Sequence, residues 1–198
     1  VCIFPQQPVE LVHFVDEQPL KMQLSDFFQV NGPVNRAMVQ QALAWLQPQK
    51  EDVIWDLFAG HGNFSMPLAR RCQHVSAVEV QADMVSSLQR QAESLALSLH
   101  AIEADLSNSG VLAHLPAPDK VLLDPPRAGA AALMQELNAR KVSQVLYVSC
   151  DAATLARDLS TLAAAGYQIE KAGIMDMFPQ THHVETMVLL SYRDKCRG

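Results

Sequence analysis

The sequence predicts an α/β fold built around a mostly parallel sheet, and three observations support this prediction. Short apolar runs typical of strands alternate with longer amphipathic runs typical of helices between residues 52 and 166. Alternation of this kind favours parallel strands with helices on both faces of the sheet. The last two strand-like runs follow each other without a helix, so they are expected to pair antiparallel. The 198 residues, 49% hydrophobic and 18% charged, suffice for one large core.

The expected elements can be placed in order along the chain. Residues 1–25 hold two short strand-like pieces that could not form a core alone, and we interpret them as the remnant of an upstream domain. Residues 26–198 are expected to form the main domain. Its predicted helices lie at 34–46, 64–72, 82–96, 131–139 and 151–166, and its predicted strands at 52–58, 74–80, 99–105, 120–126, 143–150, 167–177 and 183–192. The helix at 82–96 is expected to place Met84, Val85, Leu88 and Leu95 on one apolar face.

Charge and cysteine content exclude several classes of protein. The net charge of -6 argues against a protein that holds RNA or DNA by general attraction to phosphate, so any basic contact surface must be local. No apolar run approaches the ~20 residues of a membrane helix and no signal peptide opens the chain, so we expect a soluble cytoplasmic protein with no membrane partner. The four cysteines form no C-x-x-C pair, so reduced thiols are expected rather than disulfides or a metal site.

Polar groups stand where five predicted strands end. They are Asp56 with the loop glycines Gly60 and Gly62, Glu79, Asp105, Asp124 and Cys150. Because the carboxyl ends of parallel strands meet at one edge of a sheet, these groups are expected to line one ligand site. A glycine loop followed by acidic side chains favours a cofactor that contains adenosine, with Glu79 accepting from the ribose and Asp105 reaching the adenine. This pattern fits both NAD and S-adenosylmethionine.

Each of the other candidates has more than one interpretation. Cys150 is either a nucleophile, with a pKa lowered by the helix N-terminus that follows it, or a small buried apolar side chain. Asp124 precedes two prolines, which either form a stiff turn that holds functional groups in place or only begin a helix, and Arg127 is available for a phosphate or a carboxylate. Glu185 is either a functional charge on the core side of the last strand or a solvent-facing residue of an alternating strand.

Five strings carry a resemblance to a known family: FFQVN, DLFAGHGNFS, LLDPPRAG, YVSCDAATLARD and DMFPQTHHVETM. In this order they resemble the catalytic domain of the S-adenosylmethionine-dependent RNA uracil-C5 methyltransferases, and the most similar branch acts on 23S ribosomal RNA. The resemblance runs from about Asp26 to Tyr192. It implies a Rossmann-like class I methyltransferase fold, with a mostly parallel seven-stranded sheet and an antiparallel last strand, and it makes residues 26–198 the catalytic domain.

The resemblance also implies the chemistry and the residues that perform it. Cys150 would add to C6 of the uracil and Glu185 would remove the C5 proton, which gives 5-methyluridine and S-adenosylhomocysteine. The implied cofactor residues are Gln29, Phe58, Gly60, Asn63, Glu79, Asp105 and Asp124, and the implied substrate residues are Gln29, Asp124, Arg127 and Phe178. The implied partner is 23S ribosomal RNA, bound by a monomer. An iron–sulfur cluster is implied only for the full-length protein, not for this chain.

One departure and several alternatives remain. The string Ser149-Cys150-Asp151-Ala152 replaces the family string S-C-N-P. Asp151 can still cap the next helix, but its charge is expected to raise the pKa of Cys150.

The alternative functions are a tRNA uracil-C5 methyltransferase, an RNA cytosine-C5 methyltransferase, an NAD-dependent oxidoreductase and a non-catalytic module that binds RNA or cofactor. Cytosine enzymes need a cysteine beside the motif of Asp124, and none stands there. No hydride-transfer constellation is evident either, so uracil methylation is favoured.

Overall fold

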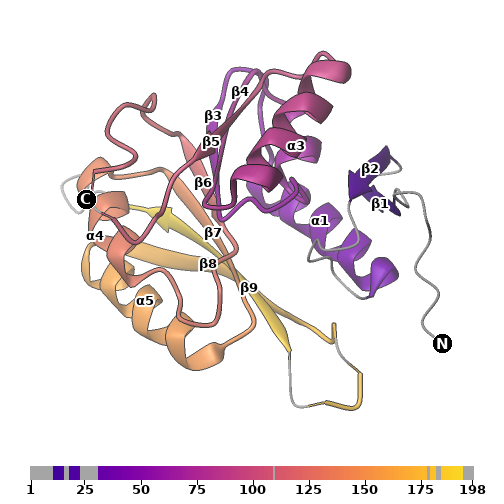
Figure 1. The fold of residues 1–198 in the computed structure, drawn as a ribbon. Coiled ribbons are helices and arrows are strands. Elements are labelled where there is room, and N and C mark those ends of the chain that lie inside the picture. Colours follow the sequence, from indigo (N-terminus) through magenta and orange to yellow (C-terminus); the bar gives the residue numbers. More distant parts are fainter. Residues whose placement is uncertain are drawn as a thin grey trace.

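The computed structural model describes residues 11–15, 18–22, 31–108, 110–177, 179–181 and 184–193. Two predicted site residues, Gln29 and Phe178, lie outside these ranges. The described residues form a seven-stranded sheet with helices on both faces, and a separate antiparallel pair of strands near the N-terminus (Figure 1). None of the helices in this part of the chain is both long and apolar enough to cross a membrane.

The large sheet has the strand order β5-β4-β3-β6-β7-β9-β8. The first five strands in this order pair in parallel, whereas β9 pairs antiparallel with both β7 and β8, so the predicted sheet is confirmed. The strands are β3 (Val53–Leu57), β4 (His74–Glu79), β5 (Leu99–Glu103), β6 (Lys120–Leu123), β7 (Gln144–Ser149), β8 (Tyr167–Met175) and β9 (Glu185–Tyr192), and the separate pair is β1 (Leu11–Val15) and β2 (Gln18–Met22). The helices are α1 (Gly32–Leu46), α2 (Ser65–Ala69), α3 (Ala82–Ser94), α4 (Ala131–Arg140) and α5 (Ala152–Ala164).

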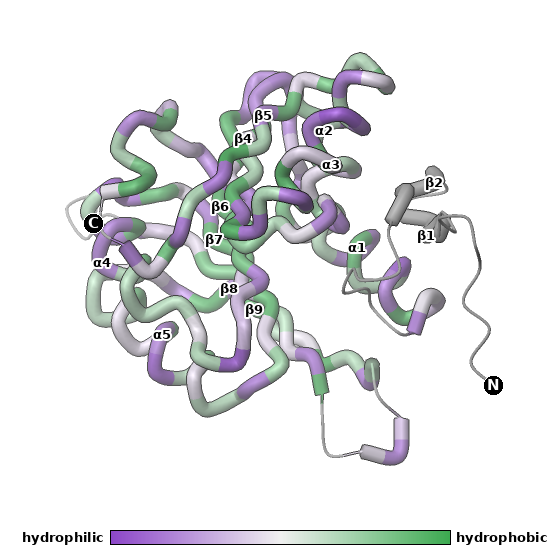
Figure 2. The backbone as a smooth tube through the Cα atoms, viewed as in Figure 1, coloured by the Kyte–Doolittle hydropathy of each residue, from purple (hydrophilic) through white to green (hydrophobic). Residues whose placement is uncertain are grey.

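Side chains of the central strands alternate between two hydrophobic clusters, because helices cover both faces of the sheet. In β3, Ile54 packs into the cluster beneath α1, α2 and α3, whereas Trp55 and Leu57 pack into the cluster beneath α4 and α5. All three side chains are fully buried. Figure 2 shows hydrophobic residues concentrated along the central strands. Burial on both faces explains why these strands read as continuous apolar runs.

Helix α3 corrects one predicted core residue. Met84 and Leu88 are buried as expected, and Ala92 continues their four-residue spacing. Leu95, which was expected on the same face, is 45% exposed. It lies beyond the last residue of α3, so the chain has already left the helical path that would have directed it to the core.

Gly62 lies in the loop between β3 and α2 and packs against Leu88 of α3. Its φ of +91° falls in the left-handed region, and a Cβ atom there would lie 2.4 Å from Leu88 Cδ1 and 3.1 Å from Met66 Cγ. Glycine is therefore required both by the backbone conformation and by the close approach of α3.

We expect Gly62→Ala to lower the free energy of unfolding by about 3 kcal/mol, because it adds overpacking to an unfavourable backbone conformation. Gly110→Ala is the matched control, since Gly110 has a φ of +80° but a Cβ there would meet no atom within 4 Å. The control should cost only about 1 kcal/mol. Urea denaturation measures both values, and equal losses would mean that the contact with Leu88 has no energetic weight.

Candidate active site

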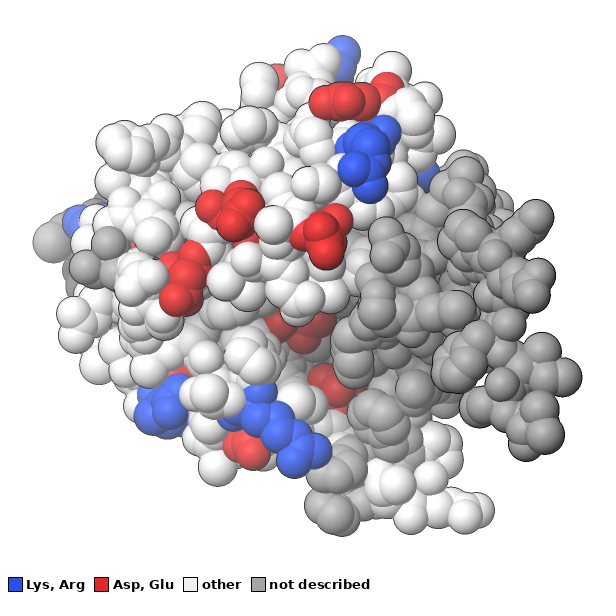
Figure 3. Space-filling model, in the orientation of Figure 1, with Lys and Arg blue, Asp and Glu red and all other residues white. Residues whose placement is uncertain are grey.

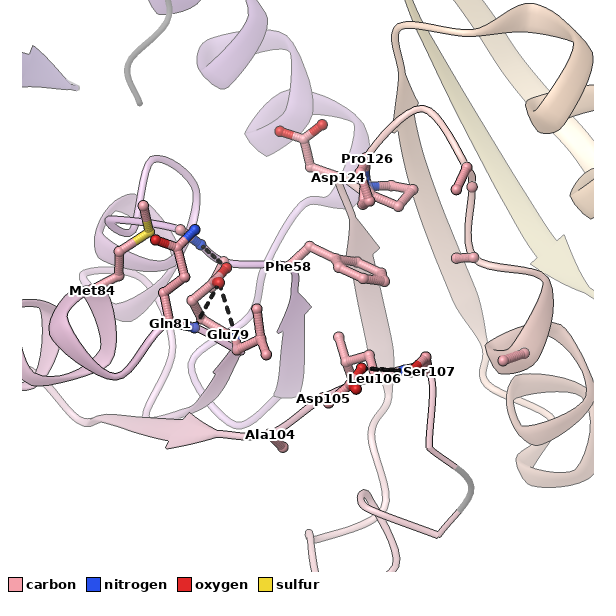
Figure 4. A pocket seen from close by; sticks show the side chains of 18 of the residues that line it. Phe58, Glu79, Gln81, Met84, Ala104, Asp105, Leu106, Ser107, Asp124 and Pro126 are labelled. Carbon is pink, nitrogen blue, oxygen red and sulfur yellow. Dashed lines mark hydrogen bonds between the residues drawn. The ribbon is translucent and has the colours of Figure 1, made fainter. Parts of the chain in front are cut away.

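A cavity of about 690 Å³ opens at the carboxyl edge of the parallel strands (Figure 4). Eight of the predicted site residues line it: Phe58, Gly60, Asn63, Glu79, Asp105, Asp124, Cys150 and Glu185. The structure thus brings together residues from both halves of the sheet. Three of the expected residues that the structure describes do not line the cavity: Asp56, Gly62 and Arg127. Asp56 is buried near the end of β3, Gly62 packs against Leu88, and Arg127 is exposed.

Sequence reasoning missed the apolar part of the lining. Val80, Met84 and Leu106 contribute to it, as do the small residues at 128 to 132. Figure 4 shows Met84 grouped with Glu79 on one side of the cavity. Their positions in the sequence could have indicated them, because each of these residues follows soon after the end of a parallel strand, where ligands bind in such sheets.

The loop after β3 brings backbone atoms to the cavity. Phe58 has a φ of +66°, which is uncommon for a residue with a side chain and marks a constrained turn. The N–H of Ala59 donates to the carbonyl of Val78 in β4 at 3.0 Å, which holds the turn against the sheet. A Cβ on Gly60 would meet no atom within 4 Å, so a ligand can approach the backbone closely there.

Glu79 is a buried carboxylate that accepts hydrogen bonds from backbone amides. Its Oε2 accepts from the N–H of Gly60 at 3.0 Å, and its Oε1 accepts from the N–H groups of Val80 and Gln81 at 2.9 and 3.0 Å. The side chain therefore joins the glycine loop to the start of α3. A carboxylate offers about four acceptor positions, so Glu79 can still accept from a hydroxyl group in the cavity.

Asn63 is held by Asn35 of α1 through a reciprocal pair of amide hydrogen bonds. Asn35 Nδ2 donates to Asn63 Oδ1 at 2.8 Å, and Asn63 Nδ2 donates to Asn35 Oδ1 at 3.0 Å. Asn35 is fully buried. The pair ties α1 to the glycine loop, and the side chain of Asn63 is a fixed part of the cavity wall.

Asp56 lies at the end of β3 and is 1% exposed. Its Oδ2 accepts from the hydroxyl of Ser65, and its Oδ1 has no hydrogen-bond partner among the described residues. Burial, with a smaller contribution from the charge of Glu79, raises the pKa of Asp56 to about 7. The fold therefore favours the neutral carboxylic acid over a wide range of pH.

Asp124, Glu185 and Cys150 form an acidic cluster at the cavity. Burial, followed by the charge of Glu185, raises the pKa of Asp124 to about 8, and burial raises the pKa of Glu185. Burial also raises the pKa of Cys150, and the charge of Glu185 raises it further. The net shift is upward, opposite to the lowered pKa that the nucleophile interpretation expected, because burial and the acidic neighbours outweigh a backbone hydrogen bond and the charge of Arg127.

Asp151 is the N-cap of α5, as expected from the sequence. Its Oδ1 accepts from the N–H groups of Ala153 and Thr154 at 3.0 and 2.9 Å. Hydrogen bonds to the helix amides, chiefly that of Thr154, lower the pKa of Asp151. The expectation that the charge of Asp151 raises the pKa of Cys150 is wrong: the acidic groups that raise it are Glu185 and, to a smaller extent, Asp124.

Asp105 is the most exposed of the predicted acids. It accepts from the N–H and the hydroxyl of Ser107 at 2.9 and 2.7 Å and from Asn108 Nδ2 at 3.2 Å. The hydrogen bonds from Ser107 lower the pKa of Asp105, so this carboxyl is a carboxylate at the rim of the cavity.

Cys72 shows what a structural cysteine looks like in this fold. It is 3% exposed, its Sγ donates to the carbonyl of Leu68 at 3.2 Å, and burial raises its pKa to about 11. Cys72 does not line the cavity, whereas Cys150 does. In the part of the chain that the structure describes, no group of three or more His, Cys, Asp or Glu side chains is arranged to hold a metal ion.

Comparisons with known proteins agree with this arrangement. The family model described as tRNA (Uracil-5-)-methyltransferase matches residues 9–103 and 111–193. The 23S rRNA (uracil(1939)-C(5))-methyltransferase RlmD of Marinomonas posidonica is 48% identical over 86% of this chain and 40% of its own length. RlmD of Pseudomonas aeruginosa is 48% identical over 83% of this chain and 37% of its own length. The chain therefore spans about two fifths of the length of the curated relatives it matches.

Solved structures share the same fold. The tRNA (uracil-54, C5)-methyltransferase of Pyrococcus abyssi, solved with S-adenosyl-L-homocysteine, is 28% identical with a TM-score of 0.80, over 91% of this chain and 44% of its own. The tRNA m1G37 methyltransferase of M. jannaschii has a TM-score of 0.73 at 14% identity, over 96% of this chain and 59% of its own, which is a likeness of fold alone. The predicted Rossmann-like methyltransferase fold is confirmed.

We expect Asp56→Asn to make stability less dependent on pH. The folded pKa of about 7 lies above the ordinary value of 3.8, so the folded protein keeps a proton that the unfolded chain releases. The free energy of unfolding therefore falls as the pH rises from about 4 to about 7. Urea denaturation at about pH 5 and about pH 8 should show a fall that is smaller in the variant by on the order of 2 kcal/mol.

The control for this measurement is Asp83→Asn, which removes an exposed carboxylate from the first turn of α3. Its stability should depend on pH as the wild-type protein does. A fall of the same size in Asp56→Asn would show that Asp56 does not retain its proton on folding.

We expect Glu185→Gln to speed the alkylation of Cys150 by iodoacetamide roughly five-fold at about pH 8, because loss of a neighbouring negative charge lowers the pKa of the thiol. Asp151→Asn is the matched control and should change the rate by less than about two-fold. Mass spectrometry of the peptide that contains Cys150 separates it from the other thiols. If Asp151→Asn has the larger effect, the charge next to the thiol in sequence is the one that controls it.

Proposed function

The chain belongs to the tRNA (uracil-5-)-methyltransferase family, and from this premise we propose that it transfers a methyl group from S-adenosylmethionine to C5 of a uridine in 23S ribosomal RNA. The product would be 5-methyluridine. One observation carries the proposal: Cys150 and Glu185, the expected nucleophile and base, line the same cavity as the glycine loop and Asp124. We further propose that residues 26–198 perform this reaction and that the protein acts in the cytoplasm.

The charge of the cavity favours S-adenosylmethionine over NAD. Acidic side chains line it, and Figure 3 shows such side chains in the hollow at the middle of this face of the molecule. Negative charge favours a cationic sulfonium and disfavours the pyrophosphate of NAD. Glu79 would hold the ribose, Asp105 the adenine, and the open backbone at Gly60 would approach the amino-acid part of the ligand. S-adenosylmethionine supplies the electrophilic methyl group.

Cys150 and Glu185 would divide the remaining chemistry between them. The Cys150 thiolate adds to C6 of the uracil, and the electron pair of the C5–C6 double bond then makes C5 nucleophilic enough to take the methyl group. Glu185 removes the proton from C5. The electron pair of that C–H bond restores the double bond, and the thiolate leaves. A cation held beside the acidic cluster would favour the thiolate form of Cys150, whose pKa is raised in the protein without a ligand.

The RNA must deliver an unpaired base to this cavity. A thiol at the edge of a sheet cannot reach C6 of a stacked uridine, so the target base has to be flipped out. Arg127 is exposed beside the cavity and is suited to a phosphate contact. Ribosomal RNA is favoured over tRNA because the relatives named for 23S rRNA are 48% identical and the archaeal tRNA enzyme is 28% identical.

We expect RNA containing 5-fluorouridine to form a covalent adduct with the protein in the presence of S-adenosylmethionine, because fluorine at C5 cannot leave as a proton would. Cys150→Ser should abolish the adduct, and Glu185→Gln should accumulate an adduct even with ordinary uridine. Cys72→Ser is the matched control and should behave like the wild-type protein. Denaturing gel electrophoresis detects the adduct.

The full-length protein is used, since this chain spans only part of its relatives. An adduct that persists in Cys150→Ser would overturn the assignment of the nucleophile. The absence of any adduct in a protein that is folded and binds S-adenosylmethionine would overturn the proposed reaction. Mapping 5-methyluridine in 23S RNA and tRNA incubated with the enzyme decides between the two substrates.

A further inference from the structure

A buried carboxylate outside the cavity joins two segments that border it. The side chain of Asp158 in α5 is 0% exposed. Its Oδ2 accepts from the hydroxyl of Tyr147 and from the N–H of Ala130, both at 2.7 Å. Its Oδ1 accepts from Arg157 Nε at 2.8 Å and pairs with Arg157 Nη2 at 2.8 Å. Asp158, Tyr147, Arg157 and the Ala130 backbone are called the Asp158 junction below.

Each part of the Asp158 junction belongs to a segment that leads to a cavity residue. Tyr147 lies in β7, which ends immediately before Cys150, and α5 begins two residues after that cysteine. Ala130 closes the loop that begins at Asp124 and leads into α4. The carboxylate of Asp158, in the helix that follows Cys150, therefore contacts both the strand that precedes Cys150 and the loop that carries Asp124.

The loop between β6 and α4 lies directly against the Asp158 junction. Arg157 Nη2 donates to the carbonyl of Ala128 at 2.9 Å. Gly129 has a φ of +76°, and a Cβ there would lie 2.6 Å from Arg157 Nη2 and 2.6 Å from Asp158 Oδ2. Helix α4 has no side-chain cap of its own and no acidic residue in its first turn, so the carboxylate from α5 provides the negative charge at its N-terminus.

We propose that Asp158 is a positioning residue for the methyl transfer: it fixes the loop that carries Asp124 relative to the strand and helix that flank Cys150. The inference rests on the proposed function, because it assigns a role in that reaction. A buried charged network is weak evidence for stability, since well-packed apolar replacements are often neutral. Three directed donors and an ion pair around one carboxylate do, however, fix the relative orientation of the segments that supply them.

Two variants disturb the Asp158 junction to different degrees. Asp158→Asn keeps the shape of the side chain but turns one acceptor oxygen into an NH2 donor that faces other donors. Tyr147→Phe removes one hydroxyl and leaves the carboxylate paired with Arg157 and Ala130. Tyr167→Phe is the matched control, because this buried hydroxyl donates to the carbonyl of Leu137 in the second half of α4 and not to the loop.

The experiment measures three properties of each variant in the full-length protein: the melting temperature, hydrogen exchange of the peptide covering residues 125–131, and kcat with KM for methylation of 23S RNA. We expect Tyr147→Phe to speed exchange in this peptide and lower kcat, each about five-fold, with KM for S-adenosylmethionine within two-fold. Asp158→Asn should lower kcat about 100-fold, as expected when reacting groups are misplaced by about 1 Å. Tyr167→Phe should keep the exchange rate and kcat within about two-fold of the wild-type values, even if its melting temperature falls as far as that of Tyr147→Phe.

The outcomes separate this inference from the proposed function. If the two tyrosine variants change kcat equally for the same loss of melting temperature, or if exchange at residues 125–131 does not change in Tyr147→Phe, Asp158 has a structural role only and the inference is overturned. If the wild-type protein binds S-adenosylmethionine but methylates no RNA, the proposed function fails. The exchange measurement needs no turnover, so it tests the coupling of loop and junction in either case.

Discussion

The parallel pairing of β3, β4, β6 and β7 is the constraint on which the site depends. Parallel strands end at the same edge of a sheet. The backbone hydrogen bonds between these strands, rather than any contact of the side chains, therefore bring together Asp56, Glu79, Asp124 and Cys150. Register matters equally, because a slip by one residue would turn every buried side chain of a strand to the opposite face. The geometry of the cavity is therefore set by the apolar packing of the whole sheet.

The fold accommodates its buried carboxyl groups in two different ways. Glu79 remains paired with three backbone amides, which replace the water that a carboxylate loses on burial. For Asp56 and Asp124, burial is the main cause that raises the pKa values to about 7 and about 8. Glu79 is thus a fixed acceptor, whereas Asp124 lines the cavity and its charge can respond to a ligand that enters. A cationic ligand would shift Asp124 toward its charged form.

The sheet and most of the cavity could be predicted from the sequence because the signals are local. Each strand is a short apolar run, and a polar residue such as Glu79 or Asp124 stands at or just after its end. The cause of the raised pKa of Cys150 could not be predicted: the sequence points to Asp151, whereas the pKa depends on burial and on Glu185, which reaches the thiol only through the pairing of β7 with β9. The Asp158 junction was missed for the same reason: its partners come from separate elements that only tertiary packing brings together.

Strand β9 reaches the cavity from the opposite direction to β7. Ser149, the last residue of β7, pairs with Thr186 near the start of β9, so Cys150 follows a strand whereas Glu185 begins one. The proposed nucleophile thus belongs to the parallel core, whereas the proposed base belongs to the closing hairpin formed by β8 and β9. A change in the register of this hairpin would therefore move Glu185 relative to Cys150 while the parallel strands and the glycine loop keep their places.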